Sequence, residues 1–104
     1  MKKIIIGLIF LFLCSTVVFA DNIKDSETYY NQGNAKTNLK EAIKDFNKAI
    51  ELNPKFAEAY LTRGMTKARL QDYTGAIKDY NKALELNPKC AKAYYNRGLL
   101  SRGH

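Results

Sequence analysis

The sequence predicts an all-α fold in which helix-turn-helix repeats stack into an α-α superhelix. Two observations predict it. Residues 42–60 and 76–94 are nearly identical and lie 34 residues apart, and a fixed period of this size is the signature of stacked repeats. Within each segment, apolar residues recur at three- and four-residue steps, as they do along one side of an amphipathic helix.

The first 20 residues have the pattern of a secretory signal peptide. A basic start (MKK) precedes an apolar run over residues 4–13, and the segment ends in VFA, with small or aliphatic residues where a leader peptidase cuts. We therefore expect cleavage after Ala20 and an exported protein, either periplasmic or secreted.

Two alternatives for this segment stay open. Residues 4–20 are at the lower limit of a membrane-spanning helix, so an uncleaved leader would anchor the chain in a membrane. Cys14 could instead be acylated as in a lipoprotein, although Leu13 stands where a small residue is preferred before the modified cysteine.

Five helices are expected after the leader. Asn53-Pro54 ends the second of them, because the residue before a proline is pushed out of the α region. Pro54 would then occupy the first turn of the next helix, and Asn87-Pro88 repeats this arrangement. Asp72 is the expected N-cap of the fourth helix. The predicted helices cover residues 25–36, 40–52, 55–70, 73–86 and 89–101, with connections so short that successive helices run antiparallel.

The repeat also divides the chain. A further copy of the start of the unit, YYNQG at 29–33, matches YLTRG at 60–64 and YYNRG at 94–98. We expect a shortened first unit over 26–56, a second unit over 57–90, and an incomplete third unit over 91–104 that contains only its first helix.

These repeated positions resemble the tetratricopeptide repeat, a helix-turn-helix unit of 34 residues. Gln32 and Arg63 replace the leucine that precedes glycine in the family pattern, and Lys67 replaces its mid-helix tyrosine. The small, aromatic and proline positions that carry the resemblance are Tyr29, Gly33, Ala42, Phe46, Ala49, Pro54, Tyr60, Gly64, Ala76, Tyr80, Ala83 and Pro88.

The resemblance implies a protein-interaction scaffold or adaptor. In this family the first helix of each unit lines a concave face, where a partner peptide lies. Transferred to this chain, the groove residues are Tyr30, Asn31, Asn34, Glu58, Leu61, Thr62, Met65, Lys92, Tyr95, Asn96 and Leu99. Some members grip a C-terminal carboxylate with a set of Lys, Arg and Asn residues, and here only Asn34 and Lys92 match that set.

No residue pattern indicates catalysis, a metal or another cofactor. The only histidine is His104, at the end of the chain, where it would be a poor catalytic base or ligand. The formal net charge is +7, but the lysines alternate with acidic residues instead of clustering as in a nucleic-acid surface. Cys90 is expected to be a small buried apolar group.

The partner is therefore expected to be a protein or peptide, with no nucleic acid, and with a membrane only if the leader is not cleaved. A second function class stays open. The third unit lacks a second helix, so its exposed edge, with Tyr95 and Leu100 on the outer side, could pair with another copy of the chain.

Overall fold

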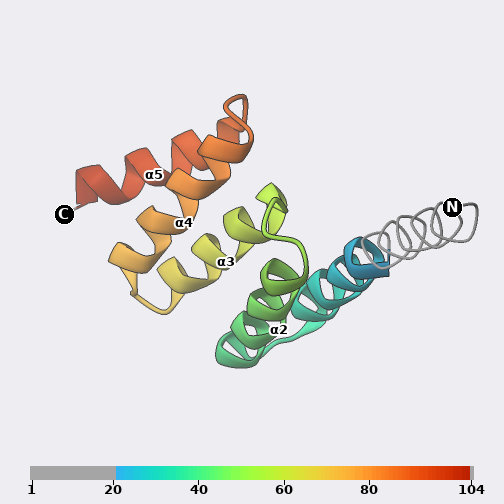
Figure 1. The fold of residues 1–104 in the computed structure, drawn as a ribbon. Helices are drawn as coiled ribbons and strands as arrows, with labels where there is room; N and C mark the ends of the chain where they lie inside the picture. The colour runs from blue at the N-terminus through green and yellow to red at the C-terminus, as the bar shows by residue number, and fades with distance from the viewer. Residues whose placement is uncertain (1–20, 104) are drawn as a thin grey trace, which may run out of the picture.

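The computed structural model describes residues 21–103, which form a single array of antiparallel helices. Figure 1 shows the chain advancing from one helix to the next, with α5 at one end of the array. The all-α repeat fold predicted from the sequence is confirmed, while the predicted signal peptide lies outside the described residues. The helices are residues 21–35, α2 (Leu39–Leu52), α3 (Ala57–Arg69), α4 (Tyr73–Leu86) and α5 (Ala91–Gly103).

The two Asn-Pro pairs form turns between helices, and this corrects the predicted starts of α3 and α5. The Asn53 side chain accepts a hydrogen bond from the Lys55 N–H at 3.2 Å, and the Asn53 carbonyl accepts one from the Phe56 N–H at 3.1 Å. Pro54 therefore occupies the second position of a turn, as proline commonly does, and does not belong to the first turn of α3. The turn at Asn87 has the same hydrogen bonds.

Side chains and backbone groups also fix the other helix ends. Asp72 caps α4 as predicted, because its carboxylate accepts from the Gly75 N–H at 3.0 Å. Asn38 does the same for α2 by accepting from the Glu41 N–H. At the end of α3 the Asp72 N–H donates a hydrogen bond to the Lys67 carbonyl, and Gln71 has a positive φ of 68°. This is a Schellman ending with glutamine at the position that usually holds glycine.

The core is formed mainly by small and aromatic residues of the second helix in each unit. Phe46 of α2 and Tyr80 of α4 are its largest fully buried side chains. Ala83 of α4 lies in one cluster with Leu61 of α3 and Ala93 of α5. The alanines allow neighbouring helices to approach closely, so each unit is joined both internally and to the next unit.

Glycine on the first helix of a unit makes room for the aromatic ring of the second. A Cβ added at Gly33 would lie 2.6 Å from the Phe46 ring, and one added at Gly64 would lie 2.8 Å from the Tyr80 ring. At the corresponding Gly98 of α5, no side-chain or distant backbone atom of the described residues lies within 4 Å of an added Cβ. The third unit therefore has the glycine of this contact without the ring.

Two sequence expectations near α5 need correction. Cys90 is half-buried and has a free thiol, so it is less enclosed than expected. Leu100 packs against the core cluster of α3 and α4 and does not lie on the outer side. The exposed large apolar side chains of this helix are instead Tyr94, Tyr95 and Leu99.

Within the described range, no helix combines the length and the apolar character needed to cross a bilayer.

Candidate functional site

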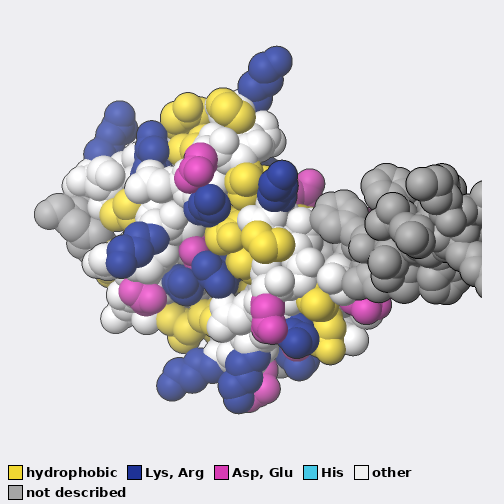
Figure 2. Space-filling view, viewed as in Figure 1, with side chains coloured by type: hydrophobic (Ala, Val, Ile, Leu, Met, Phe, Trp, Pro, Cys, Tyr) yellow, Lys and Arg dark blue, Asp and Glu magenta, His cyan; other side chains and the backbone are white. Residues whose placement is uncertain are grey.

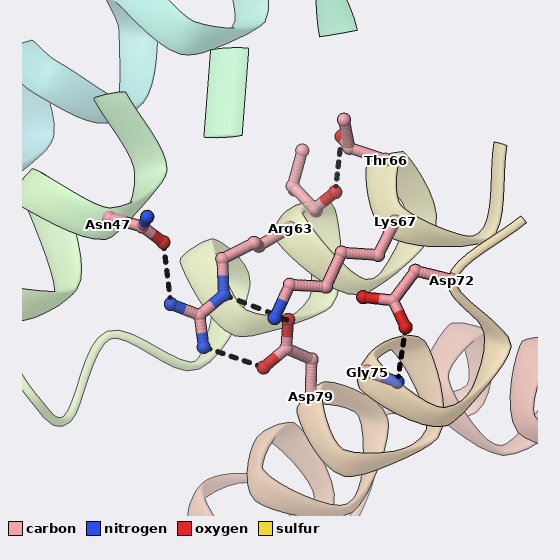
Figure 3. A network of polar contacts seen from close by, with 8 residues as sticks. Asn47, Arg63, Thr66, Lys67, Asp72, Gly75 and Asp79 are labelled. Carbon is pink, nitrogen blue, oxygen red and sulfur yellow. Dashed lines mark hydrogen bonds and ion pairs between the residues drawn. The ribbon is translucent and has the colours of Figure 1, made fainter. Parts of the chain in front are cut away.

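A buried ion-pair network holds the second unit together and sets the position of its first helix (Figure 3). Asp79 of α4 is only 4% exposed. It accepts two hydrogen bonds from the Arg63 guanidinium of α3, at 2.8 and 2.7 Å. Lys67 Nζ lies 3.2 Å from the same carboxylate. The bidentate geometry fixes the spacing of the two helices.

Arg63 also connects the second unit to the first. Its third guanidinium contact is a hydrogen bond donated to the Asn47 side chain of α2, at 2.9 Å (Figure 3). The hydrogen bonds to Asp79 raise the pKa of Arg63, against the lowering effect of burial. Its guanidinium is therefore held charged between three helices of the stack.

The shortened first unit uses a different cation for the equivalent carboxylate. Asp45 corresponds to Asp79, but Gln32 stands at the position of Arg63. Lys36, just after the first described helix, lies 2.8 Å from Asp45. The contact with the Asp45 carboxylate raises the pKa of Lys36. The pairing survives although the unit has lost three residues relative to the second.

Tyr80 makes the fold sensitive to high pH. Burial, with a smaller contribution from the charge of Asp79, raises the pKa of Tyr80 above its ordinary value of 10.0. The folded state therefore keeps this proton where the unfolded chain loses it. This part of the stability is fully present below about pH 10 and is lost as the pH rises from there through the folded-state pKa.

We expect Tyr80→Phe to remove this part of the alkaline sensitivity while keeping the fold, since Phe46 fills the equivalent position in the first unit. Urea unfolding of both proteins at pH 8 and pH 11 measures it. The loss of unfolding free energy between the two pH values should be smaller in the variant, and an equal loss would contradict the assignment to Tyr80.

The first described helix is joined to α3 through Tyr30. Its hydroxyl lies 3.1 Å from the Thr62 hydroxyl, within hydrogen-bond distance. Its ring packs at a tilt against Phe46 and Phe56, with centroids 5.9 and 5.0 Å apart. Tyr30 therefore lies between the units and forms part of the stack as well as of the surface.

Two hollows side by side form a groove along the first helices of the three units. One, of about 150 Å³, lies between the first described helix, α2 and α3. The other, of about 230 Å³, lies between α3, α4 and α5. Met65 and Arg69 of α3 line both hollows. We call this the Met65 groove, and the residues that define it are Asn34, Lys36, Thr62, Met65, Arg69, Asn96 and Leu99.

A larger hollow of about 540 Å³ lies at the other end of the first helices. Glu27, Tyr30 and Asn31 line it from the first described helix, and Glu58 lines it from α3. Lys55 and other residues of the turn before α3 complete it. This hollow is more polar than the Met65 groove and carries both charge signs.

The structure distributes the predicted groove residues over several places. Asn34, Thr62, Met65, Asn96 and Leu99 come together in the Met65 groove. Tyr30, Asn31 and Glu58 line the larger hollow. Leu61 is 9% exposed and belongs to the core, so it is not a surface residue. Lys92 is exposed and lines none of these hollows, and Tyr95 lies at the end of the array.

Two residues of the groove were missed by the sequence reading. Arg69 lines both hollows from the last turn of α3, and Lys36 lines one of them from the loop after the first helix. Both residues lie at or beyond the end of a helix, where helical spacing no longer shows which side of the helix a residue faces. Their positive charge could have pointed to them, because cations are favoured near the carbonyl end of a helix.

Charge elsewhere on the surface is dispersed. In Figure 2, Lys and Arg side chains are spread over the visible face, with acidic side chains and apolar patches between them. Exposed pairs such as Lys48–Glu51 and Lys82–Glu85 place opposite charges one turn apart on the same helix. The Met65 groove differs in having cations and no acidic residue in its lining.

Comparison with known proteins identifies the family. The profile of the TPR repeat matches residues 28–71 and 64–101, which is more than half of the chain. The chain therefore belongs to the tetratricopeptide repeat family. This is a non-catalytic fold that typically serves protein-protein interaction.

A sequence relative carries the repeat as a small part of an enzyme. Over 53 residues, 48% of this chain, it is 42% identical to the UDP-N-acetylglucosamine–peptide N-acetylglucosaminyltransferase of Giardia intestinalis. The matched segment is only 4% of that enzyme. The likeness therefore concerns the repeat and not the activity of the whole enzyme.

Solved structures share the fold. MamA superposes with a TM-score of 0.75 at 30% identity, over 76% of this chain and 48% of that one, so this chain spans about half of MamA. The first TPR of Spaghetti (RPAP3) superposes with a TM-score of 0.70 at 32% identity, over 75% of this chain and 64% of that one. That domain was solved with the HSP90 peptide SRMEEVD bound.

Proposed function

We propose that the protein is an interaction module that binds an extended peptide segment of a partner protein in the Met65 groove. The observation that carries the proposal is the composition of this groove. Met65 is 41% exposed and Leu99 is 49% exposed, so both offer apolar area to a partner. Asn34 and Asn96 flank them and can donate or accept hydrogen bonds to a peptide backbone.

The charge of the groove selects the partner segment. Arg69 lines both hollows and makes no ion pair within the described part of the chain. A free guanidinium beside exposed apolar side chains favours a segment that combines acidic with apolar residues. The HSP90 peptide bound by Spaghetti has this composition, and it supports the general chemistry without identifying the partner of this chain.

Selection of short random peptides displayed on phage, with the full chain as target, tests the proposal. We expect enriched peptides to combine Asp or Glu with Leu, Met or Phe. Arg69→Glu should weaken their binding by about tenfold or more, because it replaces attraction by repulsion at the centre of the groove.

Lys78→Glu is the matched control, since it makes the same change of charge at an exposed position of α4 that lines none of the hollows. It should leave binding within about twofold of the unchanged chain. Equal effects of the two substitutions, or enrichment without acidic residues, would contradict the proposed groove.

We further propose that this interaction takes place outside the cytoplasm, in the periplasm or after secretion. The leader-like composition of residues 1–20 supports export. N-terminal sequencing of the protein purified from its native cells tests it. The expected mature chain begins at Asp21, whereas an intact N-terminus would support the membrane-anchored alternative.

A second candidate function is self-association through the end of the array. The exposure of Tyr94, Tyr95 and Leu99 on α5 favours it. Sedimentation of the full chain over a range of concentrations distinguishes it from groove binding. Tyr95→Lys is the variant to use, because Leu100 packs on the core and its replacement by lysine would disturb the fold itself.

A further inference from the structure

The face that α5 leaves open is an incomplete copy of the contact between α3 and α4. It consists of Tyr94, Tyr95, Arg97, Gly98 and Leu99, and we call it the open face of α5. Tyr94 is 50% exposed and Tyr95 is 69% exposed. These side chains, with Gly98, line a hollow of about 460 Å³ at the end of the array.

Arg97 is held by the same two kinds of contact as Arg63, but no carboxylate of the described residues pairs with it. Arg63 donates to Asn47 at 2.9 Å, and Arg97 donates to Asn81 at 2.8 Å. Each guanidinium also lies over the tyrosine three residues before it, at 5.5 Å for Arg63 and 5.3 Å for Arg97. Arg63 in addition binds Asp79, whereas Arg97 has no ion pair in the described part of the chain.

Gly98 is the equivalent of Gly64 in the third unit, but it lacks the contact that Gly64 makes. At Gly64 the Tyr80 ring occupies the space where a side chain would be. At Gly98 none of the residues from 21 to 103 occupies this space. In both complete contacts the ring directly follows the carboxylate in sequence, as Asp45-Phe46 and as Asp79-Tyr80. An incoming helix with an aspartate followed by an aromatic residue would therefore fill both vacant positions together.

The charges of α5 decide between a second copy and a different partner. Residues 91–103 contain Lys92, Arg97 and Arg102 and no acidic residue. Two copies meeting through α5 would bring these cations together, which is unfavourable. The α4 helix of another copy is also unavailable, because its Asp79 and Tyr80 are buried against its own α3.

We propose that the open face of α5 binds a helix of a partner protein that carries an aromatic residue directly after an aspartate. The aspartate pairs with Arg97, and the aromatic ring packs against Gly98 between Tyr94 and Leu99. This second interaction site shares Leu99 with the Met65 groove but does not include Arg69. It selects an acidic amphipathic helix, whereas the groove selects an extended segment.

A peptide with the sequence of residues 72–87 is the probe, because it holds Asp79 and Tyr80 in the required register. It is stapled on its opposite side to keep it helical, since an isolated helix of this length is marginal in water. Fluorescence anisotropy of the labelled peptide, titrated with the full chain, should show saturable binding. Peptides with Asp79→Asn or Tyr80→Ala should bind about tenfold more weakly or worse.

Gly98→Ala in the full chain is the decisive variant. Its added Cβ meets nothing among the described residues, so we expect the fold to be unaffected, but it would clash with an incoming ring as it would at Gly64. We expect it to weaken peptide binding about tenfold or more, while the thermal unfolding transition stays the same or rises. Arg97→Gln should weaken binding about tenfold. This second variant tests the contact with the aspartate separately from the contact with the ring.

Arg69→Glu separates this site from the Met65 groove, because it should leave binding of the helical peptide unchanged. Three outcomes would overturn the proposal. These are absence of binding, binding that is equally strong in Gly98→Ala, and a full chain that sediments as a dimer which Gly98→Ala converts to a monomer. The last result would assign the open face to a second copy.

Discussion

Asp79→Ala is expected to cost about 3–5 kcal/mol of unfolding free energy, the effect of removing one partner from a buried ion pair. Asp79 is the carboxylate that both Arg63 and Lys67 contact. Their side chains are only 17% and 22% exposed, so neither charge is fully recovered by water after the substitution. Urea unfolding followed by circular dichroism measures the loss.

Glu85→Ala is the control for this prediction. Glu85 also lies on α4 and pairs with a lysine, with Lys82 Nζ 3.3 Å away, but its side chain is 69% exposed. Its removal should change stability by no more than about 0.5 kcal/mol. Similar losses for Asp79→Ala and Glu85→Ala would mean that burial does not determine the strength of the Arg63–Asp79 contact.

Gly64→Ala is expected to destabilise the fold by overpacking. The new Cβ would lie 2.8 Å from the Tyr80 ring and 3.1 Å from Asp79 Cβ, and both neighbours are buried and cannot move aside freely. Overpacking of this kind costs about 1–3 kcal/mol. The better helix propensity of alanine returns about 0.5–1 kcal/mol, so we expect a net loss of about 1–2 kcal/mol in chemical denaturation.

The same substitution at Gly98 should have the opposite sign. Its Cβ meets no side chain in the described part of the chain, so only the propensity gain of about 0.5–1 kcal/mol remains. The comparison uses one chemical change at two equivalent positions of the repeat. Stabilisation at both positions, or destabilisation at both, would contradict the arrangement of rings and glycines described above.

The fold was predictable because its determinants repeat in the sequence. The 34-residue period and the apolar stripes predicted the helices, and the bounds of α2 and α4 agree with the structure to within one residue. The starts of α3 and α5 were wrong because the Asn53 and Asn87 side chains hydrogen-bond the local backbone and hold a turn after each proline. Such side-chain bonds compete with helix formation, and their outcome is not visible in helical periodicity.

The candidate site was predictable only in part, because it depends on contacts between helices. The family resemblance placed Met65 and Asn96 correctly among residues that line hollows, but it also included Leu61, which is buried in the cluster formed mainly with α4. The Arg63–Asp79 pair spans 16 residues, which no single-helix pattern reveals. The sequence does contain one sign of such contacts between helices. Asparagine and arginine recur 16 residues apart, as Asn47 and Arg63 and as Asn81 and Arg97, and both pairs are hydrogen-bonded.

Amide hydrogen exchange along the full chain tests whether α3 and α4 hold the stack together and whether one face of α5 is uncovered by the other described residues. At low protein concentration we predict the slowest exchange in α3 and α4 and clearly faster exchange in α5, because helices with fewer buried contacts open at lower free energy. Exchange in α5 as slow as in α3 and α4, or no protection in any helix, would contradict the account.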